Sequence, residues 1–170
     1  DFSDERIKNE LESFTNFSES VIKEKMPEYK GGFFTFTAFP DKLSKIYSSS
    51  YEIRDLMKPV KNGFDVPVFP LTATVTRTDD LPVEKIWKGT IRSWRSFYSD
   101  KDGAYLIEVF ENGVILFKNT YDLIDESGKW VSDSTIRRGC KYFIQFIEKL
   151  YGERLKDNDF VNIKIEMSDT

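Results

Sequence analysis

Ala104-Tyr-Leu-Ile-Glu-Val-Phe110 and Val114-Ile-Leu-Phe-Lys118 are two runs of mostly β-branched and aromatic residues, separated by Glu111-Asn112-Gly113. This pattern predicts a β-hairpin, because Asn-Gly supplies the two positive-φ positions of a type I′ turn. In that register Val109 lies opposite Leu116, and Phe110 lies opposite Ile115. Both faces of the hairpin are apolar near the turn. We therefore expect it to be central in a sheet and partly covered on both faces.

A long amphipathic helix is predicted behind the hairpin, from about residue 132 to Tyr151. Its apolar residues recur at helical spacing, namely Ile136, Cys140, Phe143, Ile144, Ile147, Leu150 and Tyr151. Ser132, Asp133 or Ser134 can cap its start, and Gly152 suits the left-handed position that ends many helices. Cys140 lies on the apolar stripe, where a thiol behaves as a small hydrophobic group.

The N-terminal part of the chain predicts a helix, a strand and a further helical segment. A helix from Ser3 to about Lys25 is indicated by apolar residues at helical spacing, namely Ile7, Leu11, Phe14, Val21 and Ile22. Residues 15–18 form helix poorly, so a break there, with Ser18 capping a second piece, is the alternative. Residues 33–39 alternate as in a strand, with one face made of Phe34, Phe36 and Ala38. Residues 41–57 suggest one interrupted helix or two short ones.

The remaining elements are predicted from turn residues and alternation. Three prolines and a glycine between residues 58 and 70 predict a loop or a short edge pairing, and this segment is a candidate contact surface. Apolar and polar residues alternate without exception over residues 71–77, which predicts a strand with one exposed face. Residues 83–98 are interpreted as a turn or short helix followed by a strand. Apolar and polar residues also alternate over residues 161–167, which predicts the last strand.

Together these elements predict an α+β domain, with two main helices packed on one face of a largely antiparallel sheet of five or six strands. The length of 170 residues fits one globular domain, residues 1–170, with a substantial core. Residues 1–27 are either a helix of that domain or a linker. Because residue 1 is Asp rather than Met, we expect the domain to be excised from a longer chain.

The composition narrows the chemistry that is open to the chain. Its 25 basic and 29 acidic residues give a net charge of −4. This charge disfavours a protein that binds nucleic acid over its whole surface. The chain has no histidine and a single cysteine, which excludes an intramolecular disulfide and a cysteine-built zinc site. No glycine-rich phosphate loop is present. We therefore predict no metal and no cofactor, and we expect that the chain is not an enzyme.

No apolar run approaches the roughly 18 residues that a membrane-spanning helix requires. We therefore expect a cytoplasmic protein without a membrane partner, and the lone cysteine is consistent with a reducing compartment. A carboxylate-based hydrolase stays open as an alternative, although no two of the 29 acidic residues stand out as a catalytic pair.

One segment interleaves cations with flat aromatic rings, and it supplies most of the candidate binding residues: Lys85, Trp87, Lys88, Arg92, Trp94 and Arg95. Such a strand could bind phosphates while its rings stack on bases. The structural alternative is an exposed strand whose tryptophans cap the core and whose arginines are solvated or stacked on them. Arg137 and Arg138 are further candidates, because cations near a helix start suggest either a bound anion or a pairing with Asp133.

A short resemblance to a known family rests on residues 105–115, Tyr-Leu-Ile-Glu-Val-Phe-Glu-Asn-Gly-Val-Ile, with looser support from Phe33 to Pro40. This stretch resembles the region that follows the Schlafen-type AlbA_2 domain in bacterial ATP-binding or DNA-binding proteins. The resemblance covers about a tenth of the chain. It implies an accessory C-terminal part of a longer bacterial protein, and the nucleotide-binding residues of the family's first domain have no counterparts in this chain.

These observations favour a non-catalytic binding or interaction domain, acting as a sensor or accessory part of a larger intracellular protein. Its partner would be another protein or another domain of the parent chain. The first alternative is a nucleic-acid-binding accessory domain that uses residues 85–98, and the second is the carboxylate hydrolase. The hairpin itself is expected to be a scaffold, with the contact surface beside it.

Overall fold

The computed structural model describes residues 2–29, 33–57, 83–88, 91–99, 104–120, 133–156 and 159–168. Its helices are α1 (Phe2–Lys25), α2 (Ser50–Met57), α3 (Asp133–Tyr151) and the short 3-10 helix η3 (Gly152–Arg154). Its strands are β1 (Phe33–Pro40), β2 (Val83–Lys88), β3 (Ile91–Ser99), β4 (Ala104–Phe110), β5 (Ile115–Asn119) and β6 (Val161–Ser168). The loop predicted at 58–70 and the strand predicted at 71–77 lie outside the described residues.

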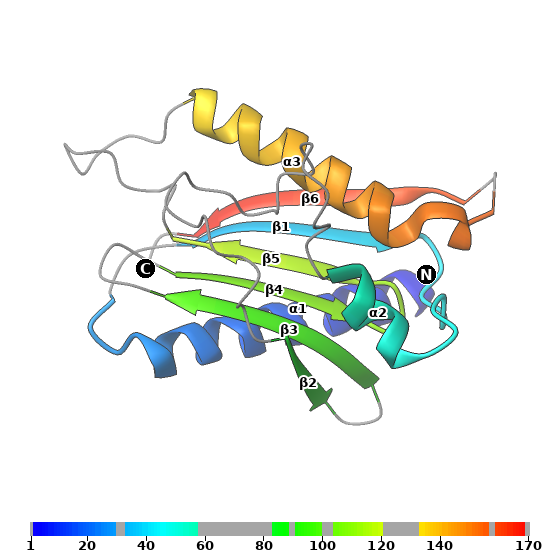
Figure 1. The fold of residues 1–170 in the computed structure, drawn as a ribbon, viewed down its shortest axis with the longest axis horizontal. Coiled ribbons are helices and arrows are strands. Elements are labelled where there is room, and N and C mark those ends of the chain that lie inside the picture. Colours follow the sequence, from blue (N-terminus) through cyan, green and yellow to red (C-terminus); the bar gives the residue numbers. More distant parts are fainter. Residues whose placement is uncertain are drawn as a thin grey trace.

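The strands form one six-stranded sheet in the order β2-β3-β4-β5-β1-β6, and each of the described pairings is antiparallel. The predicted α+β class and antiparallel sheet are therefore confirmed. The hairpin of β4 and β5 occupies the middle, and β1 lies between β5 and the last strand (Figure 1). Among the described strands, this order leaves β6 at one edge of the sheet and β2 at the other.

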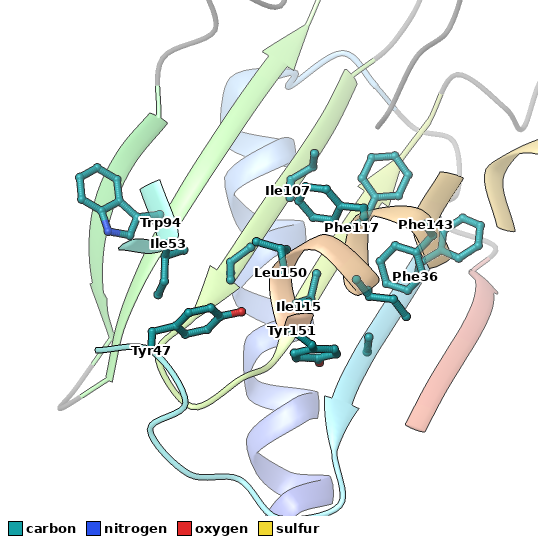
Figure 2. Close-up of a cluster of buried hydrophobic side chains, with 14 of the residues drawn as sticks. Phe36, Tyr47, Ile53, Trp94, Ile107, Ile115, Phe117, Phe143, Leu150 and Tyr151 are labelled. Atoms are coloured by element: carbon teal, nitrogen blue, oxygen red, sulfur yellow. The ribbon is translucent and has the colours of Figure 1, made fainter. Parts of the chain in front are cut away.

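The helices cover both faces of this sheet, so the prediction that they share one face is wrong. One apolar cluster joins the sheet to α2 and α3 (Figure 2), with Phe36, Ile53, Phe117, Phe143 and Leu150 among its members. A second cluster lies on the opposite face under α1, with Phe14, Ile22, Leu106, Phe110 and Leu116 among its members. The physical reason lies in the central hairpin, because two apolar faces need a helical layer on each side.

Helix α1 is continuous, and the alternative of a break at residues 15–18 is wrong. Ser18 is fully buried, and its hydroxyl donates to the carbonyl of Thr15 at 2.7 Å, so it bonds back along the helix instead of capping a new one. Further along the same face, Glu19 binds the buried ammonium group of Lys118 at 2.7 Å. Burial lowers the pKa of Lys118, and the bond to Glu19 opposes that effect.

The turn of the central hairpin differs from the predicted two-residue type I′ turn. The N–H of Gly113 donates to the carbonyl of Phe110 at 3.0 Å, and the N–H of Phe110 donates to the carbonyl of Val114 at 2.9 Å. The loop therefore holds three residues, with Gly113 at φ +91° as the left-handed residue that closes it. The extra residue shifts the register, so that Val109 pairs with Ile115 and not with Leu116. Side chains at Ile46 and Pro40 pack against Gly113, where a Cβ would lie 3.1 Å from each.

Residues 83–88 form a strand, not the turn or short helix that the sequence suggested. β2 pairs with β3 along its whole length, from Val83 opposite Ser96 to Lys88 opposite Ile91. Val83, Ile86 and Trp87 fit a helical turn as well as a strand, so local spacing did not decide between the two. The neighbouring strand supplies the hydrogen bonds that favour the extended form.

Helix α3 buries a slightly different stripe from the predicted one. Phe143, Ile147, Leu150 and Tyr151 are buried as expected, but Phe146 is buried as well and Ile144 is exposed. A helix turns by about 100° per residue, so Ile144 lies at the margin of the face that is centred on Phe143. The helix ends at Tyr151, and Gly152 adopts φ +46°, which confirms its predicted left-handed conformation.

Two buried tyrosines allow a paired test of how α3 is fixed to the hairpin. The hydroxyl of Tyr151 donates to the carbonyl of Gly113 at 2.7 Å, whereas the buried hydroxyl of Tyr47 has no hydrogen-bond partner in the described part of the chain. Burial raises the pKa of both phenols. Replacing Tyr151 with Phe strands a buried carbonyl, so we expect the free energy of unfolding to fall by about 1–2 kcal/mol.

Replacing Tyr47 with Phe removes a buried hydroxyl that has no hydrogen-bond partner among the described residues, so stability should stay constant or rise slightly. Denaturant unfolding of the two single variants beside the parent chain measures the difference. Equal losses in both variants would show that the bond from Tyr151 to Gly113 contributes nothing of its own.

Candidate functional site

The aromatic and basic segment divides between the two faces of the sheet. Register places Lys85 opposite Trp94 and Trp87 opposite Arg92, with Lys88 at the turn end of β2. Trp94 is 6% exposed and joins the cluster under α2 and α3, whereas Arg95 is 5% exposed and contacts α1 through the Phe17 ring. Arg92 is half-buried. Because successive residues alternate across a sheet, the register places residues 85, 87, 92 and 94 on one face and residues 88 and 95 on the other, so the six candidates do not form one surface.

Arg95 forms a buried polar group with its cross-strand neighbour. Its Nη2 and Nε donate to Oε2 of Glu108 at 2.9 and 3.1 Å, and the hydroxyl of Ser93 donates to Oε1 at 2.5 Å. Glu108 is fully buried. The guanidinium also lies 5.0 Å from the centre of the Phe17 ring. The positive charge of Arg95 is thus balanced inside the fold by Glu108, and its ring contact is with Phe17 and not with a tryptophan, as the structural alternative had expected.

On the opposite face, α2 adds a surface cluster that the sequence analysis missed. Tyr51 is exposed and its ring lies 6.0 Å from that of Trp94, while the Arg54 guanidinium lies 5.1 Å from the Tyr51 ring and 5.8 Å from the Trp94 ring. Arg54 is also paired with Asp55 at 3.0 Å. The signal in the sequence was the spacing of Tyr51 and Arg54, three residues apart on a helix.

Arg137 is exposed in the N-terminal part of α3, and Arg138 occupies the next position of the same helix. That end of α3 lies beyond the β6 side of the sheet, away from β2 and β3 (Figure 1). The fold therefore does not bring the two arginines together with the candidate residues on β2 and β3.

Among the described acidic residues, Glu52 on α2 has a displaced pKa. Its Oε2 accepts hydrogen bonds of 2.7 Å from both the hydroxyl and the N–H of Ser48, and its Oε1 accepts from Arg154. The bonds from Ser48, followed by those from Arg154, lower the pKa of Glu52 to about 2. An ionised, fully bonded carboxylate ties α2 to η3. This direction is opposite to the raised pKa that the hydrolase alternative required of an acid catalyst.

A groove of about 850 Å³ lies between α1 and the strands β1 and β6. Its polar lining mixes both signs of charge, with Lys8, Glu12, Asp41, Lys164 and Glu166.

In the described part of the chain, no group of three or more histidine, cysteine, aspartate or glutamate side chains lies close enough together to hold a metal ion. Among the same residues, no helix combines the length and apolar character of a membrane span.

The open edge of β6 borders this groove and carries exposed apolar side chains. Among the described strands β6 pairs with β1 alone. Opposite Ala38, Phe36 and Phe34 of β1, the β6 row consists of Ile163, Ile165 and Met167, which are 45%, 46% and 60% exposed. We call these three residues the apolar row. The sequence predicted the alternation of this strand, but not that its apolar face would lie half open at a sheet edge.

The backbone of β6 presents the apolar row together with hydrogen-bonding groups that no other described strand pairs. The N–H of Asp41 donates to the carbonyl of Phe160 at 3.1 Å, so residue 160 directs its polar groups toward β1. Because this direction alternates along an antiparallel strand, Asn162, Lys164 and Glu166 also bond toward β1. The N–H and C=O groups of the apolar row therefore point outward. Pro40 fits this pattern, since it lies opposite Val161, where no N–H is needed toward β6.

Comparison with known proteins identifies no relative for this arrangement: no protein-family model, no curated protein and no solved structure matches the chain.

Proposed function

We propose that this chain is a non-catalytic interaction domain that binds another polypeptide by adding a strand to the open edge of β6. The observation that carries the proposal is the set of outward-facing backbone groups on the apolar row. An unpaired strand edge is a template for a further strand, in which main-chain hydrogen bonds supply affinity and flanking side chains supply selectivity. The added strand would come from a partner protein or from another domain of a longer chain.

The character of β6 supports this role. Proteins commonly protect an exposed edge strand with a proline, an inward-pointing charge or a bulge. The segment Val161–Ser168 contains no proline, and the ammonium of Lys164 is offset by Glu166 on the same strand at 2.6 Å. Ile144 is another exposed apolar side chain, and it belongs to α3, the helix that lies over the β1 and β6 side of the sheet (Figure 1). An added strand would cover apolar surface that the described fold leaves in water.

Nucleic-acid binding is the weaker alternative, because two of its candidate residues belong to the interior. Trp94 is packed under α2, and Arg95 is paired with Glu108. The net charge of −4 disfavours a polyanion as well. Binding of this kind would have to use Lys85, Trp87 and Arg92, together with Arg54 and Tyr51 of α2, because the register places residue 88 on the opposite face, with Arg95.

Site-specific photo-crosslinking tests the proposed function. A photoreactive benzoylphenylalanine replaces Ile163 of the edge strand, and in a control chain it replaces Glu24, which is exposed on α1. Both proteins are irradiated in cells that produce them. We expect polypeptide adducts at position 163 and few at position 24, because the outward backbone groups lie on β6.

A second change shows whether strand addition causes the adducts. Ile165→Pro removes an outward-facing N–H while leaving the bonds between β6 and β1 in place, so it should abolish the adducts at position 163 without unfolding the chain. Adducts with any polypeptide, including a second copy of the chain, support the proposal if they disappear with Ile165→Pro. Equal yields at positions 163 and 24 would overturn it.

A further inference from the structure

The sequence of β6 is complementary to itself when two copies run antiparallel. On one face of the strand lies the apolar row, and on the other face Lys164 and Glu166 carry opposite charges two residues apart. A two-fold axis perpendicular to the sheet keeps each face on its own side and pairs each residue with another on that face. The register of such a pair is therefore decided by which residue lies on the axis.

The charges favour one register over the others. An axis through Lys164 places two ammonium groups opposite each other, and an axis through Glu166 does the same with two carboxylates. An axis through Ile163 or Met167 shortens the overlap and sets neither charge opposite its complement. An axis through Ile165 sets Lys164 of each copy opposite Glu166 of the other.

We infer that the strand added to β6 is β6 of a second copy, in an antiparallel pairing centred on Ile165. This inference rests on the proposed function and names its partner. The two sheets then become one continuous sheet, and the Lys164–Glu166 pair of each strand, 2.6 Å apart, joins an alternating group of four charges.

The same register also satisfies the backbone and covers the apolar row. Ile165 lies opposite Ile165 of the second copy, and Ile163 lies opposite Met167, so the residues with outward N–H and C=O groups meet one another. The half-exposed side chains of the row pack across the axis and lose their contact with water. Because the axis preserves the faces, both α3 helices lie on the same side of the joined sheet, antiparallel to each other and with Ile144 exposed on each.

Exchanging the two charges tests the partner and the register together. Sedimentation of the full chain over a range of concentrations should show a monomer–dimer equilibrium. Lys164→Glu alone, or Glu166→Lys alone, converts both cross-axis pairs into like charges and should weaken self-association by about 10- to 100-fold. The double variant K164E/E166K should restore dimers, and so should an equal mixture of the two single variants. Lys141→Glu makes the same charge change on the exposed side of α3 and should leave the equilibrium unchanged.

Lys164 and Glu166 are partly exposed, so circular dichroism should show that every variant keeps its fold. Failure of the mixed variants to associate would overturn the register. A wild-type chain that stays monomeric at all concentrations would contradict the inference that the partner is a second copy of the chain. In that case adducts at position 163 with a different polypeptide would still support the proposed function, so the two proposals fail separately.

Discussion

Replacing Arg95 with alanine is expected to lower the free energy of unfolding by about 3–5 kcal/mol. The guanidinium is the charged partner of Glu108, which is fully buried, at 2.9 Å. Without Arg95 the carboxylate would keep only the hydroxyl of Ser93, and an uncompensated charge inside a protein is costly. The measurement is denaturant unfolding of Arg95→Ala beside the parent chain, followed by circular dichroism.

A double variant separates the charge effect from lost packing. Arg95→Met with Glu108→Leu removes both charges and keeps apolar volume between the sheet and Phe17 of α1, so it should be more stable than Arg95→Ala. Arg92→Ala, on the opposite face of the same strand, serves as the matched arginine control and should cost less. A loss below about 1 kcal/mol for Arg95→Ala would mean that Glu108 is not buried as an ion.

Replacing Phe110 with alanine is expected to lower the free energy of unfolding by a similar amount, about 3–5 kcal/mol. Phe110 is fully buried at the end of β4, and its ring stacks on Phe14 of α1 with the ring centres 4.0 Å apart and the planes inclined by 13°. The change removes both the buried area and the stacking contact, and it leaves a cavity between α1 and the hairpin. Denaturant unfolding gives the total loss.

Hydrogen exchange locates where that loss is felt. Amides of α1 should lose more protection than those of β4, because the sheet keeps its strand pairing while the helix loses its contact. Phe160→Ala removes the same side chain at a position that is 74% exposed, so its effect should stay within about 0.5 kcal/mol. Equal effects at residues 110 and 160 would contradict the packing of α1 on the hairpin.

Much of the fold could be predicted because its signals are local. The alternation at Phe34, Phe36 and Ala38 and the helical spacing up to Tyr151 both identified elements that the structure contains. The hairpin was also predicted, but its register was displaced by one residue. An Asn-Gly pair is compatible with both a two-residue and a three-residue loop. In the three-residue loop of this hairpin, Gly113 lies against the side chains of Ile46 and Pro40, which are distant from it in the sequence.

The candidate site was predicted less well, because it depends on neighbours that are distant in sequence. Trp94 and Arg95 are adjacent in the chain and looked like one surface, but a strand sends them to opposite faces. Nothing near Arg95 indicated that Glu108, on the next strand, would balance its charge. The composition alone did not show which cations would remain at the surface.

The sequence by itself determined most of the helices and strands of this protein, its antiparallel sheet, and the need for cover on both faces of the central hairpin, but not strand β2. These properties follow from residue type and period, which act within a single element. The tertiary structure alone decided that α1 covers the face opposite α3, that Arg95 is neutralised inside, and that β6 ends the sheet with its apolar row half exposed. Strand order and burial depend on which elements pack together, and the periodicity of one segment does not encode its neighbours.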